Sequence, residues 1–106
     1  MASLPNITGI DNENSGLMPE TVQLHQNYPN PFNPSTTIEF SIPEAMNVTL
    51  EVFNMLGERV SLLVNETMTA GAHTIQWNAS EVPSGIYTYR LTAGNQVSNR
   101  KMILLR

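Results

Sequence analysis

The feature of this chain that most restricts its fold is a two-residue alternation of apolar and polar side chains that starts at Thr36 and continues to the C-terminal end. Because successive side chains of a β-strand point to opposite faces of a sheet, this period predicts strands rather than helices. The runs are short, and turn residues separate them. They predict strands at residues 36–42, 47–53, 58–64, 72–77, 86–93 and 96–105, with a shorter strand near residues 24–28.

Glycine and proline mark three of the turns. Gly57 ends a run that is typical of a type I turn, with the glycine in the left-handed conformation that it adopts at little cost. Pro83 and Gly85 take the second and fourth positions of a second predicted type I turn, over residues that begin at Val82. Gly94 suits the first position of a two-residue type II′ hairpin. Tight turns of this kind connect antiparallel strands.

About seven short antiparallel strands in roughly 100 residues predict an all-β fold, an immunoglobulin-like sandwich. Residues 65–71 are expected to form a longer connection within it. Trp77 is the predicted large core residue, and Tyr87 is placed to form a tyrosine corner, in which the hydroxyl bonds to upstream backbone. The chain has no cysteine, so packing alone must stabilise the fold and the Cys–Trp–Cys signature of antibody domains is missing.

Residues 27–35, with the sequence NYPNPFNPS, interleave three prolines with three asparagines. Proline lacks an N–H and restricts the residue before it, so this segment forms neither a helix nor a central strand. We expect an ordered loop whose asparagines bond nearby backbone groups. Tyr28 and Phe32 are expected to be apolar side chains that fix the loop to one end of the sandwich. A peptide-binding loop is the alternative.

Residues 1–22 show no sustained period and are rich in asparagine and acidic residues. We expect a disordered linker or tag-derived arm there, followed by one folded domain at residues 23–106. No run approaches the ~20 apolar residues of a membrane helix. No signal-peptide pattern is present either, and the Met-Ala-Ser start favours a fragment whose export signal lay upstream in a longer protein.

Charge argues against nucleic acid as a partner, because the formal net charge is -4 and phosphate binding requires a basic stripe. The basic residues are unevenly placed. Arg100, Lys101 and Arg106 lie in the last seven residues, which contain no acid. A basic chain end is either simply solvated or a site that a partner protein recognises.

Catalytic residues are not predicted. A Ser-His-Asp triad would depend on Asp11, the only aspartate, which falls in the expected arm. His73 alternates with core positions and is expected to be a partly buried packing residue, while His25 is expected to be structural or exposed. Glu39 and Glu51 fall on the outer faces of consecutive predicted strands, where two glutamates act as solubilising groups rather than as a glycosidase pair.

No cofactor and no metal site are predicted either. The chain lacks Cys ligands, a His pair four residues apart and an Asp-x-Asp run, and it has no phosphate-binding loop or dinucleotide motif. A calcium site formed by backbone carbonyls of a loop remains an alternative, since no side-chain pattern marks such a site. Trp77 and the outward-facing Phe53 are the aromatic residues that would serve a carbohydrate-binding module, which is an alternative function.

The sequence resembles a known family along nearly the whole expected domain. The opening run LHQNYPNPFNPSTTI is similar to the start of type A C-terminal sorting domains of the type IX secretion system of Bacteroidota and related phyla. The resemblance continues in order through residues 52–58 (VFNMLGE), 70–73 (AGAH), 77–79 (WNA), 82–87 (VPSGIY) and 100–106 (RKMILLR). It implies an immunoglobulin-like sandwich related to that of the flagellar hook-capping protein.

The resemblance also implies a function. Such a domain directs an upstream cargo domain through an outer-membrane translocon after export to the periplasm, and a sortase-like peptidase removes it and links the cargo to surface lipopolysaccharide. The protein is then secreted or on the cell surface, with no transmembrane segment of its own. The family positions matched in this sequence are Pro83, Gly85, Tyr87, Gly94, Lys101, Met102, Ile103 and Leu104.

Structural reasoning explains some of these family positions, and it leaves others without a structural role. Turn geometry explains Pro83 and Gly85, and the corner bond explains Tyr87. Lys101 and Arg106 have no such structural need, so they are the predicted partner contacts. The expected mechanism is docking through an exposed terminal strand, by strand addition. A carbohydrate-binding or structural immunoglobulin-like accessory module of a secreted hydrolase is the alternative.

Overall fold

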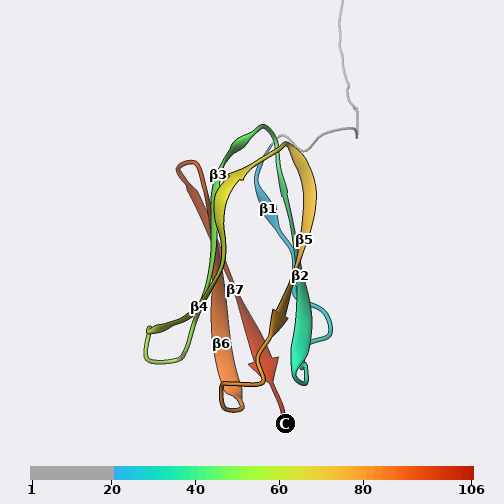
Figure 1. Cartoon of the computed structure of the whole chain (residues 1–106), viewed down its shortest axis with the longest axis vertical. Coiled ribbons are helices and arrows are strands. Elements are labelled where there is room, and N and C mark those ends of the chain that lie inside the picture. The colour runs from blue at the N-terminus through green and yellow to red at the C-terminus, as the bar shows by residue number, and fades with distance from the viewer. Residues whose placement is uncertain (1–20) are drawn as a thin grey trace, which may run out of the picture.

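The computed structural model describes residues 21–106, which form two β-sheets packed face to face (Figure 1). The first sheet has the order β1-β2-β5, with β1 at Gln23–Leu24, β2 at Ser35–Ile42 and β5 at Gly71–Asn78. The second has the order β4-β3-β6-β7, with β3 at Met46–Phe53, β4 at Arg59–Met68, β6 at Gly85–Ala93 and β7 at Gln96–Leu104. All pairs are antiparallel. The predicted all-β sandwich of about seven strands is confirmed.

The topology is immunoglobulin-like, with one strand in a different place. In constant-type immunoglobulin domains the fourth strand belongs to the sheet of the first two. Here β4 pairs with β3 instead, which gives three strands in one sheet and four in the other. The chain therefore passes from sheet to sheet after β2, after β4 and after β5. Among residues 21–106 no helix is long and apolar enough to cross a membrane.

The core lies between the sheets and contains the residues that the alternation assigned to the inner faces. Each buried aliphatic or aromatic side chain stabilises the fold by about 1.5–3 kcal/mol relative to exposure. Six of the predicted inward residues are completely buried, namely Ile38, Phe40, Ile42, Val48, Leu50 and Val52. From the last two strands the core receives Tyr87, Tyr89, Leu91, Met102 and Leu104.

Strand β4 is longer than the alternation predicted. Residues 65–71 were expected to form a long connection, but β4 continues to Met68 and β5 begins at Gly71. Thr67 still pairs with Asn47 of β3 in this extension. The apolar period fails because β4 lies at the edge of the sheet and buries only Val64. An edge strand tolerates polar residues on both of its faces, so the alternation of apolar and polar residues that would predict a strand is absent there.

The connection between β5 and β6 also differs from the prediction. A type I turn was expected from Val82 to Gly85, but the hydrogen-bonded turn lies three residues earlier, where the Val82 amide donates to the Ala79 carbonyl at 3.2 Å. The Asn78 side chain initiates it by accepting the Ser80 amide at 2.9 Å, as asparagine does in Asx turns. Gly57 adopts the predicted left-handed conformation, with a φ angle of 84°, and Gly94 has the positive φ, 61°, that its predicted turn position requires.

Tyr87 forms the predicted tyrosine corner. Its hydroxyl donates to the Pro83 carbonyl oxygen, four residues upstream, at 2.5 Å. The ring meets Trp77 edge-on with centroids 5.7 Å apart, and Trp77 lies 5.8 Å from Phe32. Trp77 is 6% exposed, so its predicted place in the core is confirmed. Aromatic pairs at these distances add about 0.5–1.5 kcal/mol beyond area burial.

The corner predicts a measurable stability difference between two conservative variants. Tyr87→Phe removes the hydroxyl that satisfies the Pro83 carbonyl and should lower the free energy of unfolding by about 0.5–1.5 kcal/mol. Tyr28→Phe is the matched control, because the Tyr28 side chain is 50% exposed, and it should stay within about 0.5 kcal/mol of wild type. Urea unfolding followed by tryptophan fluorescence measures both. Equal effects of the two variants would show that the corner bond contributes nothing.

Candidate functional site: the last strand and the segment that closes its edge

Strand β7 lies at one edge of the four-stranded sheet and pairs with β6 along its whole length. Its side chains divide into two sets. Met102 and Leu104 point into the core and are completely buried, whereas Lys101 and Ile103 lie on the outer face of the sheet and are exposed. Two of the four consecutive family positions in this strand therefore have a packing role, and the other two face outward.

The loop at residues 27–35, in which Asn and Pro alternate, closes the free edge of β7 over the C-terminal half of the strand. We call it the Asn–Pro loop. In an antiparallel strand, every second residue points its N–H and C=O away from its partner strand. Ile103 is such a residue: its amide donates to the Asn30 side-chain oxygen at 2.9 Å, and its carbonyl accepts the Phe32 amide at 2.9 Å. The Leu105 amide donates to the Phe32 carbonyl at 3.0 Å. Strand addition at this half would require the loop to leave.

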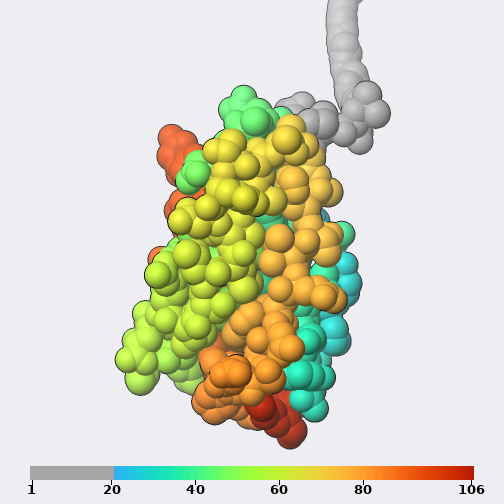
Figure 2. Space-filling model, viewed as in Figure 1, coloured from blue at the N-terminus to red at the C-terminus, as the bar shows by residue number. Residues whose placement is uncertain are grey.

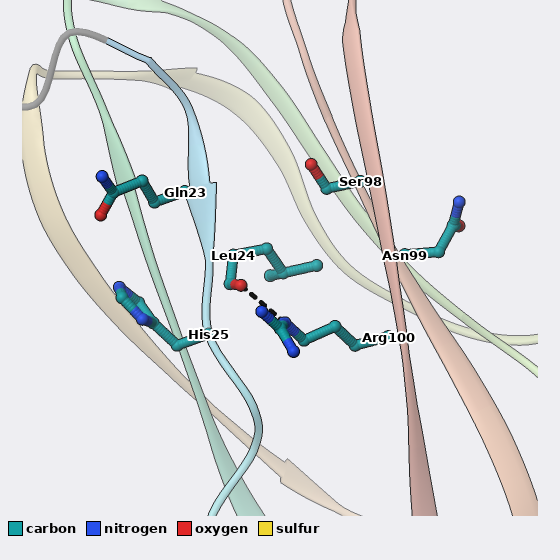
Figure 3. A pocket seen from close by; sticks show the side chains of 6 residues that line it. All are labelled: Gln23, Leu24, His25, Ser98, Asn99 and Arg100. Atoms are coloured by element: carbon teal, nitrogen blue, oxygen red, sulfur yellow. Dashed lines mark hydrogen bonds between the residues drawn. The ribbon is translucent and has the colours of Figure 1, made fainter.

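The N-terminal half of the same edge is open. Val97 and Asn99 have the same orientation as Ile103, and within residues 21–106 no hydrogen bond occupies their outward backbone groups. An open groove of about 520 Å³ lies here between β1 and β7 (Figure 3). Arg100 spans it, and its Nε donates to the Leu24 carbonyl at 2.7 Å. The two sheets are thus tied at this edge by a side chain rather than by a strand.

A buried polar cluster holds the start of the loop in place. The Tyr89 hydroxyl donates to the His25 carbonyl at 2.6 Å and accepts the Asn27 amide at 2.8 Å. The Asn27 side-chain amide then donates to the Thr36 hydroxyl at 2.8 Å and to the Pro29 carbonyl at 3.1 Å. Asn27 and Thr36 are each only 2% exposed, so these bonds satisfy polar groups that water does not reach.

Phe32 anchors the loop to the sandwich, but Tyr28 does not. The Phe32 ring is 2% exposed and packs against Trp77, as predicted. Tyr28 was expected to be a second apolar anchor, yet half of its side chain is exposed. The reason is its backbone, which exchanges two hydrogen bonds with Thr37 at 3.0 and 2.9 Å and so extends the edge of β2. This pairing turns the Tyr28 ring outward.

Arg106 has structural partners, contrary to the sequence-based expectation that it has none. Its guanidinium donates to the carbonyls of Ala79 and Val82, and its backbone amide donates to the Ser84 hydroxyl at 3.1 Å. The side chain therefore fixes the chain end to the β5–β6 connection. Lys101 differs: it is exposed, and no hydrogen bond or ion pair of its side chain occurs within the described part of the chain.

The remaining family positions lie in two places. Gly85 pairs with Leu104, and the Pro83–Tyr87 bond is directly adjacent, so these residues meet the chain end at one end of the sandwich. Gly94 occupies the β6–β7 turn at the other end of the same hairpin. Nine residues of strand separate the two ends, which is about 30 Å. A single small partner surface does not cover both.

Groups that would suit catalysis or metal binding are scattered. Within residues 21–106 no three His, Asp or Glu side chains come together as a possible metal site. His73 is partly buried, as predicted, and bonds the Thr69 carbonyl at 2.8 Å. Glu39 and Glu51 were expected on neighbouring strands, but they belong to different sheets and face opposite sides of the sandwich. Asp11 and most of the expected arm, residues 1–20, lie outside the described residues.

Comparison with known proteins identifies this arrangement. Residues 26–105 match the model of the secretion system C-terminal sorting domain. The chain belongs to this family. Domains of the family are sorting signals for type IX secretion, which implies export to the cell surface or secretion. The matched range includes both the Asn–Pro loop and β7.

Two solved structures share the fold of this sorting domain. One is dimeric latent PorU from Porphyromonas gingivalis, with a TM-score of 0.65 and 18% identity over 96% of this chain. The other is PorZ, a surface component of the type IX secretion system of Porphyromonas gingivalis, with a TM-score of 0.54 and 19% identity over 78% of this chain. This sorting domain spans only 10% and 11% of those two chains. No curated protein matches it.

The contacts between the Asn–Pro loop and β7 predict that the exchange rates of the outward amides differ between the two halves of the strand. The Ile103 and Leu105 amides, which donate to the loop, should exchange with solvent at least about tenfold more slowly than the outward amides of Val97 and Asn99. Asn30→Ala should speed exchange of Ile103 while leaving Leu105 protected. Hydrogen–deuterium exchange read by NMR gives each rate. Uniform exchange along the outer edge would rule out a closed C-terminal half.

Tyr89 predicts a pH dependence of stability. Burial raises the pKa of its phenol above the ordinary value of 10.0, and a backbone hydrogen bond at Asn27 and the charge of Arg100 oppose this only in part. The folded state therefore holds the phenol proton to higher pH than the unfolded state, so this contribution is complete below about pH 10 and is lost as pH rises through the folded pKa. Thermal melts from pH 9 to 11.5 should show a smaller decline for Tyr89→Phe, relative to its own value at pH 7, than for wild type. An equal decline in Tyr89→Phe and wild type would refute the assignment.

Proposed function

We propose that this sorting domain is the C-terminal module of a longer precursor and directs an upstream cargo domain through the type IX translocon to the cell surface. The family match over residues 26–105 is the observation that carries the proposal. On this proposal the domain passes through the periplasm, meets the translocon at the outer membrane, and is then processed by a sortase-like peptidase that attaches the cargo to lipopolysaccharide.

The placement of the ends of the described chain supports docking through the C-terminal side of the domain. Strand β1 lies in the upper part of the sandwich and the C-terminus lies at the lower end (Figure 1). A cargo domain that precedes β1 would therefore join far from the end where Lys101 and Ile103 are exposed. The translocon would approach that lower end without displacing the cargo.

The roles of the family residues follow from their contacts. Pro83, Gly85, Tyr87 and Arg106 shape the lower end, because they form the corner, the last strand pair and the bonds of the chain end. Met102 and Leu104 fill the core, and Gly94 allows the hairpin turn. Lys101 and Ile103 remain as contacts for the translocon, through the outer face of β7. Strand addition to this half of β7, which the sequence suggested, conflicts with the loop that already occupies its edge.

We infer that the domain itself is not an enzyme, in keeping with a family that is generally non-catalytic. A carbohydrate-binding role receives little support from the aromatic residues. Trp77 is buried. The Phe53 ring is covered by the Arg90 guanidinium, whose central carbon lies 4.5 Å from the ring centroid, so the flat face that a sugar would stack on is occupied.

A reporter fusion tests the proposed function. A periplasm-directed reporter fused upstream of this chain should reach the cell surface or the medium of a bacterium with a type IX system, and it should stay in the periplasm of an isogenic strain without the translocon. Fractionation and immunoblotting measure both. Deleting residues 101–106 is a poor test, because it removes Met102 and Leu104 from the core and unfolds the domain. Periplasmic retention of the intact fusion in both strains would sink the proposal.

A further inference from the structure

An apolar patch surrounds the β3–β4 turn at the lower end of the four-stranded sheet. Met55 and Leu56 form the tip of this turn and are 76% and 83% exposed, and Ile86 of β6 is 41% exposed nearby. The turn projects from the body of the sandwich, as Figure 2 shows at the lower left. Exposed apolar residues that lie singly need no explanation, but a contiguous group on one face marks an interaction site.

The patch is hollowed rather than flat. A groove of about 370 Å³ runs along the outer face of β3, β6 and β7, and its walls include Phe53, Met55, Ile86, Thr88, Arg90 and Lys101. A smaller hollow of about 220 Å³ lies on the other side of Ile86 and is lined by Leu56, Pro83 and Tyr87, among others. A concave apolar site of this kind accepts an inserted side chain, which is the usual anchor of a protein contact.

Strand pairing holds the floor of the larger groove in place. Phe53, Thr88 and Lys101 occupy one row across three paired strands. Arg90 lies over the Phe53 ring, and its Nε donates to the Asn99 side chain at 3.2 Å. These contacts order the floor before a partner binds, which lowers the entropy cost of association.

The groove carries positive charge in addition to its apolar floor. Of the cations on this face, Arg59 forms an ion pair with Glu51 at 3.2 Å, the only salt bridge within residues 21–106. Glu51 also lies across from Arg90 in the strand register, so that cation is partly balanced. Lys101 pairs in register with Thr88 and has no carboxylate partner in the part of the chain that the structure describes. The uncompensated charge of the groove is therefore at Lys101.

We propose that this groove, bounded by Met55, Ile86 and Lys101, binds an extended segment of a partner protein that inserts an apolar side chain beside Ile86 and places a carboxylate at Lys101. The inference rests on the proposed sorting function and names the surface and the chemistry of the docking partner. An acidic segment complements the unpaired cation. A second copy of this chain does not, since a two-fold contact through the same patch brings the two Lys101 side chains together.

Reporter export tests the patch with variants that each place a glutamate in the full chain. Met55→Glu and Lys101→Glu should each lower export of the fused reporter about tenfold, the loss typical of one interface anchor worth ~1.4 kcal/mol. Val97→Glu is the matched control, because Val97 is 57% exposed on the same face of β7 but at the other end of the strand, and it should export like wild type. Thermal melts of the purified chains should agree within about 3 °C, so that loss of export is not loss of folding.

A photo-crosslinking residue at position 55 identifies the occupant in exporting cells. The cross-linked peptide, mapped by mass spectrometry, should carry an Asp or Glu close to an apolar residue, and a Lys in place of that acid should restore export of Lys101→Glu. A crosslinker at position 97 should capture no such peptide.

The outcomes separate the two proposals. Failure of the wild-type fusion to export overturns the sorting function itself. Export of Met55→Glu and Lys101→Glu at the wild-type level overturns only the groove. Met55-dependent sedimentation of the chain with phosphatidylglycerol vesicles also overturns the groove, because it identifies a lipid surface as the occupant. A dimer in analytical ultracentrifugation that Met55→Glu dissociates does the same, because it identifies a second copy as the occupant.

Discussion

The hydrogen bonds between the Asn–Pro loop and the last strand are the constraint on which the rest of this structure depends. A C-terminal strand at a sheet edge would otherwise expose a row of unpaired amides and carbonyls, which invites pairing with other chains. Asn30 and Phe32 take up those of Ile103 and Leu105. The loop is in turn fixed by Phe32 in the core and by the buried Tyr89 hydroxyl. One end of the domain is thereby closed before any partner arrives.

This closure decides which part of the strand is left for the proposed recognition. With its edge occupied and its inner side chains in the core, the lower half of β7 offers only its outer face. That face carries Lys101 beside Ile86 and the projecting β3–β4 turn. The C-terminal half of β7 therefore presents no unpaired backbone edge to other chains. The proposed recognition by side chains rather than by backbone groups would also permit specificity.

Sequence reasoning reached most of the fold because the alternation is strict wherever a strand has one buried face. It succeeded for β2, β3 and β6, and for the corner at Tyr87, where a turn signal precedes a tyrosine. It failed for the second half of β4, since an edge strand needs no apolar period, and for the turn after Asn78, where a side-chain bond outweighed the Pro–Gly signal. In the site, it singled out Lys101 correctly as exposed but missed the partners of Arg106. Nothing local to Arg106 shows that the carbonyls of Ala79 and Val82 lie within its reach.

The most direct test of the closed edge is the detection of scalar couplings through its hydrogen bonds by NMR of the isotopically labelled chain. The account predicts a coupling from the Phe32 amide nitrogen to the Ile103 carbonyl carbon and another from the Leu105 amide nitrogen to the Phe32 carbonyl carbon. Absence of both couplings, in spectra that do show those between β6 and β7, would contradict it. The last strand would then be open to strand addition after all.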